Sequence, residues 1–158
     1  MTGLWGQDIA LDVNLQAKVA ANGELVLTEN VETGVQDIRL RLMTYLGTLF
    51  YDLDYGSLIP DWFYEDSTPV TRDAFIAELI MRVEADPRVE FGSVSAAIIA
   101  WNEKSISATI DWKFIDEDQP MNLVLQYDKD IRQLIISDGR KDEPDGMNIT
   151  EAEKRVWQ

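Results

Sequence analysis

The sequence predicts an α+β fold in which two main helices pack on a small, mostly antiparallel sheet. An N-terminal β-hairpin and a C-terminal tail complete it. Three observations predict this. Apolar residues recur at three- and four-residue steps in two stretches of the first half, the second half alternates apolar and polar residues, and turn-forming residues separate the segments. The length of 158 residues suits one ordinary domain with a core of its own.

The first 30 residues predict a hairpin. The stretch Ile-Ala-Leu-Asp at residues 9–12 leads to Leu15 and Val19, and Asn22-Gly23 then marks a tight turn before Glu-Leu-Val-Leu at residues 24–27. We therefore expect residues 1–30 to form short N-terminal strands that precede the core domain.

The next stretch predicts the first helix of a core domain that spans residues 31–137. Its apolar positions repeat with helical spacing, and Gly47 stands where a C-terminal cap is expected. These positions are Val31, Val35, Ile38, Leu42 and Leu46.

The second helix is predicted to begin at Thr68-Pro69, with threonine as the N-cap and proline at the first helical position. It ends at Asp86, because the residue before a proline is pushed out of the helical region. Its buried stripe consists of Phe75, Ile76, Leu79, Ile80 and Val83. Between the helices, Trp62, Phe63 and Tyr64 form an aromatic cluster that we expect to anchor a turn to the core.

Residues 89–137 have strand character. The period-two pattern is clearest from Ile106 to Phe114, and the acidic loop at residues 116–120 precedes a strand with Leu123, Leu125 and Tyr127 on one face. A further short strand is expected at residues 132–137. Residues 138–158 are predicted to form a polar linker and a short C-terminal helix at residues 151–157.

Composition excludes several classes of function. The 14 Lys and Arg residues against 29 Asp and Glu residues give a net charge of −15, which disfavours nucleic acid and anionic lipid as partners. The sequence has no histidine and no cysteine, so it can form no Ser-His-Asp or Cys-His catalytic centre and no Cys/His zinc site. The start resembles no signal peptide, and no apolar run reaches the roughly 20 residues of a membrane span. We expect a soluble protein made in the cytoplasm.

The acidic residues suggest two kinds of site. Asp52, Asp54, Asp61 and Glu65 lie near aromatic residues and would be the paired carboxylates of a glycosidase, but 29 acidic residues make chance proximity common. A calcium site at Asp52 and Asp54, or in the loop at residue 116, does not match the EF-hand spacing. We therefore expect no catalytic residue, no metal and no cofactor.

The turn after the second helix is the main candidate site. Pro87 fixes the exit from the helix and places Arg88 between helix and sheet, with Asp86 before it. Arg88 would either pair with an acidic residue of the same domain or present its planar fork to a partner. The sequence leaves both alternatives open.

The order of these features resembles the contractile-tail baseplate wedge family, which includes the sheath initiator of long-tailed phages and the small baseplate subunit of type VI secretion systems. The resemblance runs from about residue 24 to residue 127. It rests on Leu-Val-Leu at residues 25–27, Val-Gln-Asp-Ile-Arg-Leu-Arg-Leu-Met-Thr at residues 35–44, and Thr-Leu-Phe-Tyr-Asp-Leu-Asp-Tyr-Gly-Ser at residues 48–57. The last is similar to the family segment "Gly-Glu-x-x-x-x-Pro-x-Phe-Gly-Ser". Asp-Pro-Arg-Val at residues 86–89 is similar to the family signature "Glu-Pro-Arg-Ile", with Asp86 in place of Glu, and Gly47-Thr48 replaces Gly-Glu.

The resemblance implies a non-enzymatic structural subunit that joins the wedge core bundle to the first ring of the tail sheath and initiates sheath assembly. Asp86, Pro87 and Arg88 would contact that bundle, and the sheet would accept extended arms of sheath subunits by strand addition. Six copies per baseplate ring, near the tail tube, are implied, with assembly in the host cytoplasm and a final place in the virion tail. Some family members carry a lysozyme label. The alternatives are a peptidoglycan-cleaving glycosidase and an acidic adaptor or inhibitor of a basic protein.

Overall fold

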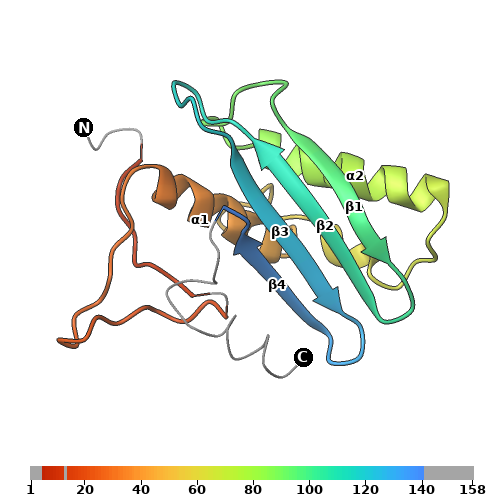
Figure 1. Ribbon diagram of the computed structural model, residues 1–158, viewed down its shortest axis with the longest axis horizontal. Helices are drawn as coiled ribbons and strands as arrows, with labels where there is room; N and C mark the ends of the chain where they lie inside the picture. The colour runs from red at the N-terminus through yellow and green to blue at the C-terminus, as the bar shows by residue number, and fades with distance from the viewer. Residues whose placement is uncertain (1–4, 13, 141–158) are drawn as a thin grey trace.

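The computed structural model describes residues 5–12 and 14–140, which form two helices against one four-stranded sheet (Figure 1). The elements are α1 (Val31–Met43), the 3-10 helix η1 (Ile59–Trp62), α2 (Pro69–Glu84), β1 (Ser95–Trp101), β2 (Ser105–Trp112), β3 (Met121–Asp128) and β4 (Gln133–Asp138). The predicted α+β class, with two main helices and an antiparallel sheet, is confirmed. Within the described ranges, no helix has the length and apolar character needed to cross a bilayer.

The sheet is a meander in which each strand pairs antiparallel with its neighbour in sequence, in the order β1-β2-β3-β4. The predicted alternation is confirmed in β2, where Ile106, Ala108, Ile110 and Trp112 are fully buried and the residues between them are partly exposed. Both helices lie on the face that these side chains cover, so the core fills the space between helices and sheet (Figure 1). The opposite face carries mostly Ser, Thr, Asn, Gln and Asp side chains, as its exposure requires.

Helix α2 begins where the sequence predicts. The Thr68 hydroxyl accepts a hydrogen bond from the Thr71 N–H at 3.2 Å, and the Thr71 hydroxyl accepts one from the Thr68 N–H at 2.9 Å. This is a capping box in which threonine takes the place of the usual Glu or Gln. Phe75, Leu79 and Val83 are fully buried against the sheet.

Helix α1 ends earlier than predicted, at Met43 rather than near Leu46. Thr44 is extended, and the chain after it pairs with the segment before η1: the Leu46 N–H donates to the Ser57 carbonyl at 3.0 Å, and the Ser57 N–H to the Thr44 carbonyl at 2.8 Å. These tertiary hydrogen bonds compete with the last helical turn. Gly47 has a φ of 85° but lies in the loop that follows, so it is no helix cap.

The aromatic cluster between the helices anchors its turn to the core, as expected. Phe63 stacks on Tyr127 of β3 with ring centres 3.7 Å apart, and the hydroxyls of Tyr64 and Tyr127 lie 2.8 Å apart. The ring of Trp62 meets Phe75 of α2 edge-on. These contacts fasten η1 to both layers.

Residues 5–12 and 14–30, here called the N-terminal arm, project from the helix–sheet core on the side of α1 (Figure 1). The predicted turn at Asn22-Gly23 is present: Gly23 has a φ of 88° and its N–H donates to the Ala20 carbonyl at 2.9 Å. A third extended segment joins the expected pair. The N–H of Ala10 donates to Val26, that of Val26 to Lys18, and that of Lys18 to Ala10, at 2.8 to 3.0 Å. The arm is held by isolated bridges where the sequence predicts short strands.

Strand β4 confirms the short strand expected near residues 132–137 and extends to Asp138, the first residue of the predicted linker. Asp138 faces Leu123 of β3 and is buried, which the polar character of the sequence around it obscures. The helix predicted at residues 151–157 lies outside the described residues.

Candidate functional site

The turn at residues 86–88, here called the Asp-Pro-Arg turn, joins α2 to the sheet. The Asp86 N–H donates to the Val83 carbonyl at 3.2 Å, and the Val89 N–H donates to the Asp86 carbonyl at 3.1 Å, so the backbone folds over directly after the helix. Val89 then forms a bridge with Phe114, just beyond β2, and the Arg88 carbonyl accepts the Ile115 N–H at 2.8 Å. The turn is therefore fixed on both sides.

Arg88 is paired inside the domain. Its Nε donates to Asp86 Oδ1 at 2.9 Å and its Nη2 to Asp86 Oδ2 at 2.6 Å, which is a bidentate pair, and Nη2 also reaches Asp37 Oδ2 of α1 at 3.0 Å. The guanidinium lies 5.6 Å from the ring centre of Trp5, and the side chain is 14% exposed. Of the two alternatives that the sequence leaves open, internal pairing is the one that the structure shows.

Charge and burial act in opposite directions on the two carboxyl groups. Burial alone raises the pKa of Asp86, but the hydrogen bonds from Arg88 and its charge outweigh burial and hold the pKa below its ordinary value. At Asp37 burial wins, and the pKa is raised although Arg88 acts to lower it. The hydrogen bonds to Asp86 raise the pKa of Arg88, so the guanidinium keeps its charge. Asp86 and Arg88 thus form the main ion pair, with Asp37 as a weaker third member.

The same arrangement occurs a second time at Asp138-Gly139-Arg140, which the sequence analysis missed. Arg140 donates through Nε and Nη2 to the two oxygens of Asp138, its N–H donates to Asp138 Oδ1, and Nη2 reaches Glu32 Oε1 of α1 at 3.1 Å. A Cβ at Gly139 would lie 1.7 Å from Asn122 Oδ1, so any larger residue there would have to displace the Asn122 side chain. The repeated Asp-x-Arg spacing is the signal in the sequence that could have found it. Two such turns therefore bind the first half of α1.

Helix α1 also holds the N-terminal arm, through a row of polar side chains. Gln36 accepts the Leu11 N–H and donates to the Ile9 carbonyl, both at 2.8 Å, and Arg39 donates to the carbonyls of Leu11 and Asp12 at 3.2 and 2.9 Å. Thr33, three residues before Gln36, lies 2.9 Å from the Thr28 hydroxyl. A helical polar stripe thus takes the hydrogen-bonding role of a neighbouring strand.

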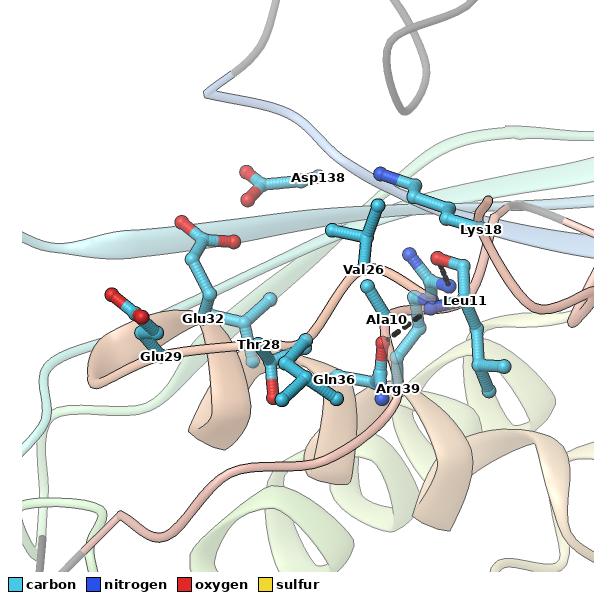
Figure 2. Close-up of a pocket in the computed structure, with 12 residues that line it drawn as sticks. Ala10, Leu11, Lys18, Val26, Thr28, Glu29, Glu32, Gln36, Arg39 and Asp138 are labelled. Atoms are coloured by element: carbon cyan, nitrogen blue, oxygen red, sulfur yellow. Dashed lines mark hydrogen bonds between the residues drawn. The ribbon is translucent and has the colours of Figure 1, made fainter. Parts of the chain in front are cut away.

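A cavity of about 310 Å³ lies between the arm, α1 and the end of β4. Figure 2 shows the carboxylates of Glu29, Glu32 and Asp138 on one side of it and the cationic groups of Lys18 and Arg39 on the other. Its lining mixes these charges with the apolar side chains of Ala10, Leu11, Val26, Leu27 and Val35, together with Thr28 and Gln36. The charges on its walls are of both signs, so it has no single preference for anions or cations.

The acidic residues considered for catalysis or metal binding lie on the surface. Asp52, Asp54, Asp61 and Glu65 are all exposed, and Asp61 accepts a hydrogen bond from the Tyr45 hydroxyl at 2.7 Å. Within residues 5–12 and 14–140, no three acidic side chains gather in a way that could hold a metal ion.

Comparison with known proteins identifies a solved structure with a similar fold. No protein-family model and no curated protein matches the sequence. Among solved structures, the chain is similar to a Geobacter sulfurreducens protein provisionally named a tail lysozyme, with a TM-score of 0.56 and 24% identity over 66% of this chain and 96% of that one. At this identity the likeness shows that the two chains share a fold. The family suggested by the sequence motifs stays a prediction.

Proposed function

We propose that the chain is a structural baseplate subunit of a contractile injection system, which joins the wedge core bundle to the first ring of the sheath and initiates sheath assembly. One observation carries the proposal: the fold matches almost the whole of a protein that is provisionally named a tail lysozyme. The ordered motifs from residue 24 to residue 127 support it independently, since they depend on the amino-acid sequence alone.

The Asp-Pro-Arg turn would bind the wedge bundle as a preformed surface. Because both Asp86 oxygens occupy the Arg88 fork, Arg88 does not offer a free fork to a partner carboxylate. Pro87 is exposed and Asp37 is partly exposed, so these two residues and the rim of Arg88 form the accessible part. A rigid surface of this kind loses little conformational entropy on binding.

The two outer strands of the sheet suit the proposed initiation of sheath assembly. Strand β1 pairs only with β2, and β4 only with β3, within the described residues. The outer strands of such a sheet offer backbone N–H and C=O groups to an added strand. Strand addition by an arm of the sheath protein would use one of them.

The deciding experiment is deletion of the gene in cells that produce the particles, with the wild-type gene restored as a control. Electron microscopy should then show tubes or baseplates without assembled sheath, and the restored particles should contain the chain together with wedge proteins, at six copies per ring. Normally sheathed tails after deletion, or particles that lack the chain, would contradict the proposal.

The role is proposed to be structural and not catalytic, and the name of the similar protein calls for a direct test. Asp37 and Asp86, whose pKa values shift in opposite directions, are the pair that an acid–base mechanism would favour. Purified wild type should not clear a peptidoglycan suspension. Clearing that Asp37→Asn abolishes while the folded state survives would establish an enzyme instead.

A further inference from the structure

Residues 45–56, here called the aromatic loop, form a closed loop after α1. Its ends meet in a short parallel pairing, with the Leu46 N–H bound to the Ser57 carbonyl at 3.0 Å and the Ser57 N–H bound to the Thr44 carbonyl at 2.8 Å. A compact surface loop with closely spaced ends is an Ω-loop, a class that often serves a function.

The aromatic loop is ordered by its own contacts. Inside it, the Thr48 N–H donates to Tyr45, the Asp52 N–H to Leu49 and the Tyr55 N–H to Asp52, at 3.1 to 3.2 Å. Outside it, the Tyr55 ring lies 4.7 Å from the Arg41 guanidinium of α1. Its shape therefore does not depend on a partner, and binding would order few additional groups.

The same loop displays three large apolar side chains to solvent. Phe50 is 89% exposed, Tyr51 73% and Leu53 62%, and the two rings touch edge-on with centres 5.2 Å apart. None of these three is buried in the loop's own fold, so their apolar surface stays in water at a free-energy cost. Adjacent exposed apolar side chains on an ordered loop are typical of a docking surface.

We propose that the aromatic loop docks into an apolar groove of a partner protein whose rim carries Lys or Arg. The acidic residues determine this choice: Asp52 and Asp54 are exposed and alternate with Tyr51 and Leu53, so the surface combines apolar groups with negative charge. A second copy of the chain, with its own net charge of −15, would be repelled. The three docking side chains are not residues of the Asp-Pro-Arg turn, although Tyr55 at the end of the loop donates a hydrogen bond to the Asp37 carbonyl at 3.5 Å. The inference does not depend on the proposed function.

The test uses the full-length chain labelled with ¹⁵N and a synthetic amphipathic helix of leucine and lysine as the probe. Chemical-shift changes should centre on the amides of Phe50, Tyr51 and Leu53. Phe50→Ser with Leu53→Ser should weaken binding by about tenfold or more, as expected when hot-spot side chains are removed.

Two control variants separate specific docking from attraction to any acidic or apolar surface. Asp116→Asn with Asp118→Asn makes the same charge change, at the same spacing and in another exposed loop, as Asp52→Asn with Asp54→Asn. Phe91→Ser removes an apolar side chain that is 91% exposed elsewhere. The controls should leave binding within twofold of the wild type, while the loop variants weaken it.

Three results would overturn the inference. The first is chemical-shift changes spread over the whole acidic surface. The second is binding of the probe that the Asp116/Asp118 control weakens as much as the Asp52/Asp54 variant does. The third is binding that persists after Phe50 and Leu53 are both replaced by serine. Sedimentation of the chain without the probe tests whether a second copy of the chain occupies the loop instead. A dimer that is lost in the Phe50→Ser, Leu53→Ser double variant would assign the loop to self-association.

Discussion

Replacing Arg88 by alanine removes the cation that neutralises Asp86. Asp86 is 2% exposed, and its carboxylate would keep only the hydrogen bond from the backbone N–H of residue 88, at 2.9 Å in the wild type. Removing one partner of a buried ion pair costs about 3 kcal/mol, because the remaining charge is left without compensation. For a domain of this length, such a loss lowers the midpoint of thermal unfolding by roughly 6 to 12 °C.

The other members of the group should respond differently. Asp86→Asn leaves Arg88 with Asp37 and should cost about 1.5 kcal/mol, the lower end of the range for a hydrogen bond to a charged group. Asp37→Asn should change stability by less than about 0.5 kcal/mol, since Asp37 is 36% exposed and its burial offsets the attraction of Arg88.

The measurement is a double-mutant cycle by urea unfolding of the wild type, Arg88→Ala, Asp86→Asn and the double variant. The coupling free energy should be about 1.5 kcal/mol, within the range of residues in direct contact. A coupling near zero, or an Arg88→Ala variant as stable as the wild type, would refute the assignment of Arg88 as an internal structural residue. It would return Arg88 to the alternative of partner binding alone.

Three further predictions concern the loop after α1, the N-terminal arm and the pH dependence of the Asp86–Arg88 pair. Gly56→Ala should destabilise the domain by about 3 kcal/mol in thermal unfolding, because Gly56 has a φ of 121° and a Cβ would lie 2.6 Å from a backbone carbonyl. The control Gly47→Ala, at a φ of 85° but in open space, should cost about 1 kcal/mol; equal losses would refute the steric argument. Gln36→Ala should speed hydrogen exchange of the Leu11 amide about tenfold and leave the amides of β2 unchanged; an unaffected Leu11 would exclude the polar stripe as its support. The stability difference between wild type and Asp86→Asn should be complete above pH 3.8, the ordinary pKa, and shrink as the pH falls through the lower folded-state pKa, in urea titrations at successive pH values. A difference that grows on acidification would contradict the sign of that shift.

The sequence predicted the elements whose signals are local. The start of α2 follows from Thr68-Pro69, and the buried face of β2 follows from strict alternation, since neither depends on distant contacts. The predicted end of α1 was wrong. The apolar spacing continues to Leu46, but hydrogen bonds with Ser57 hold the backbone in an extended conformation from Thr44 onward. Helical periodicity carries no information about such a competitor.

The candidate site was predictable in part. Asp86 is two residues from Arg88, so their pairing is a local event that the sequence could suggest. Asp37 is 51 residues away, and its approach depends on how α1 packs beside the turn after α2. The hydrogen bonds of Gln36 to the arm could not be predicted either, because the sequence does not indicate which backbone groups a buried glutamine on a helix will bind.

The polar seam between α1 and the part of the N-terminal arm that follows Trp5 has an evolutionary consequence. Trp5 itself is excluded, because it packs edge-on against the buried ring of Phe114. A segment joined to its domain through side-chain amide and guanidinium hydrogen bonds can be lost, and water can replace those bonds at small net cost. Loss of a segment that is held by apolar contacts would instead expose a hydrophobic patch that favours aggregation. Related chains can therefore lengthen, shorten or exchange this segment without redesigning the helix beneath it, so lineages could adapt the arm to new assemblies while the core stays the same.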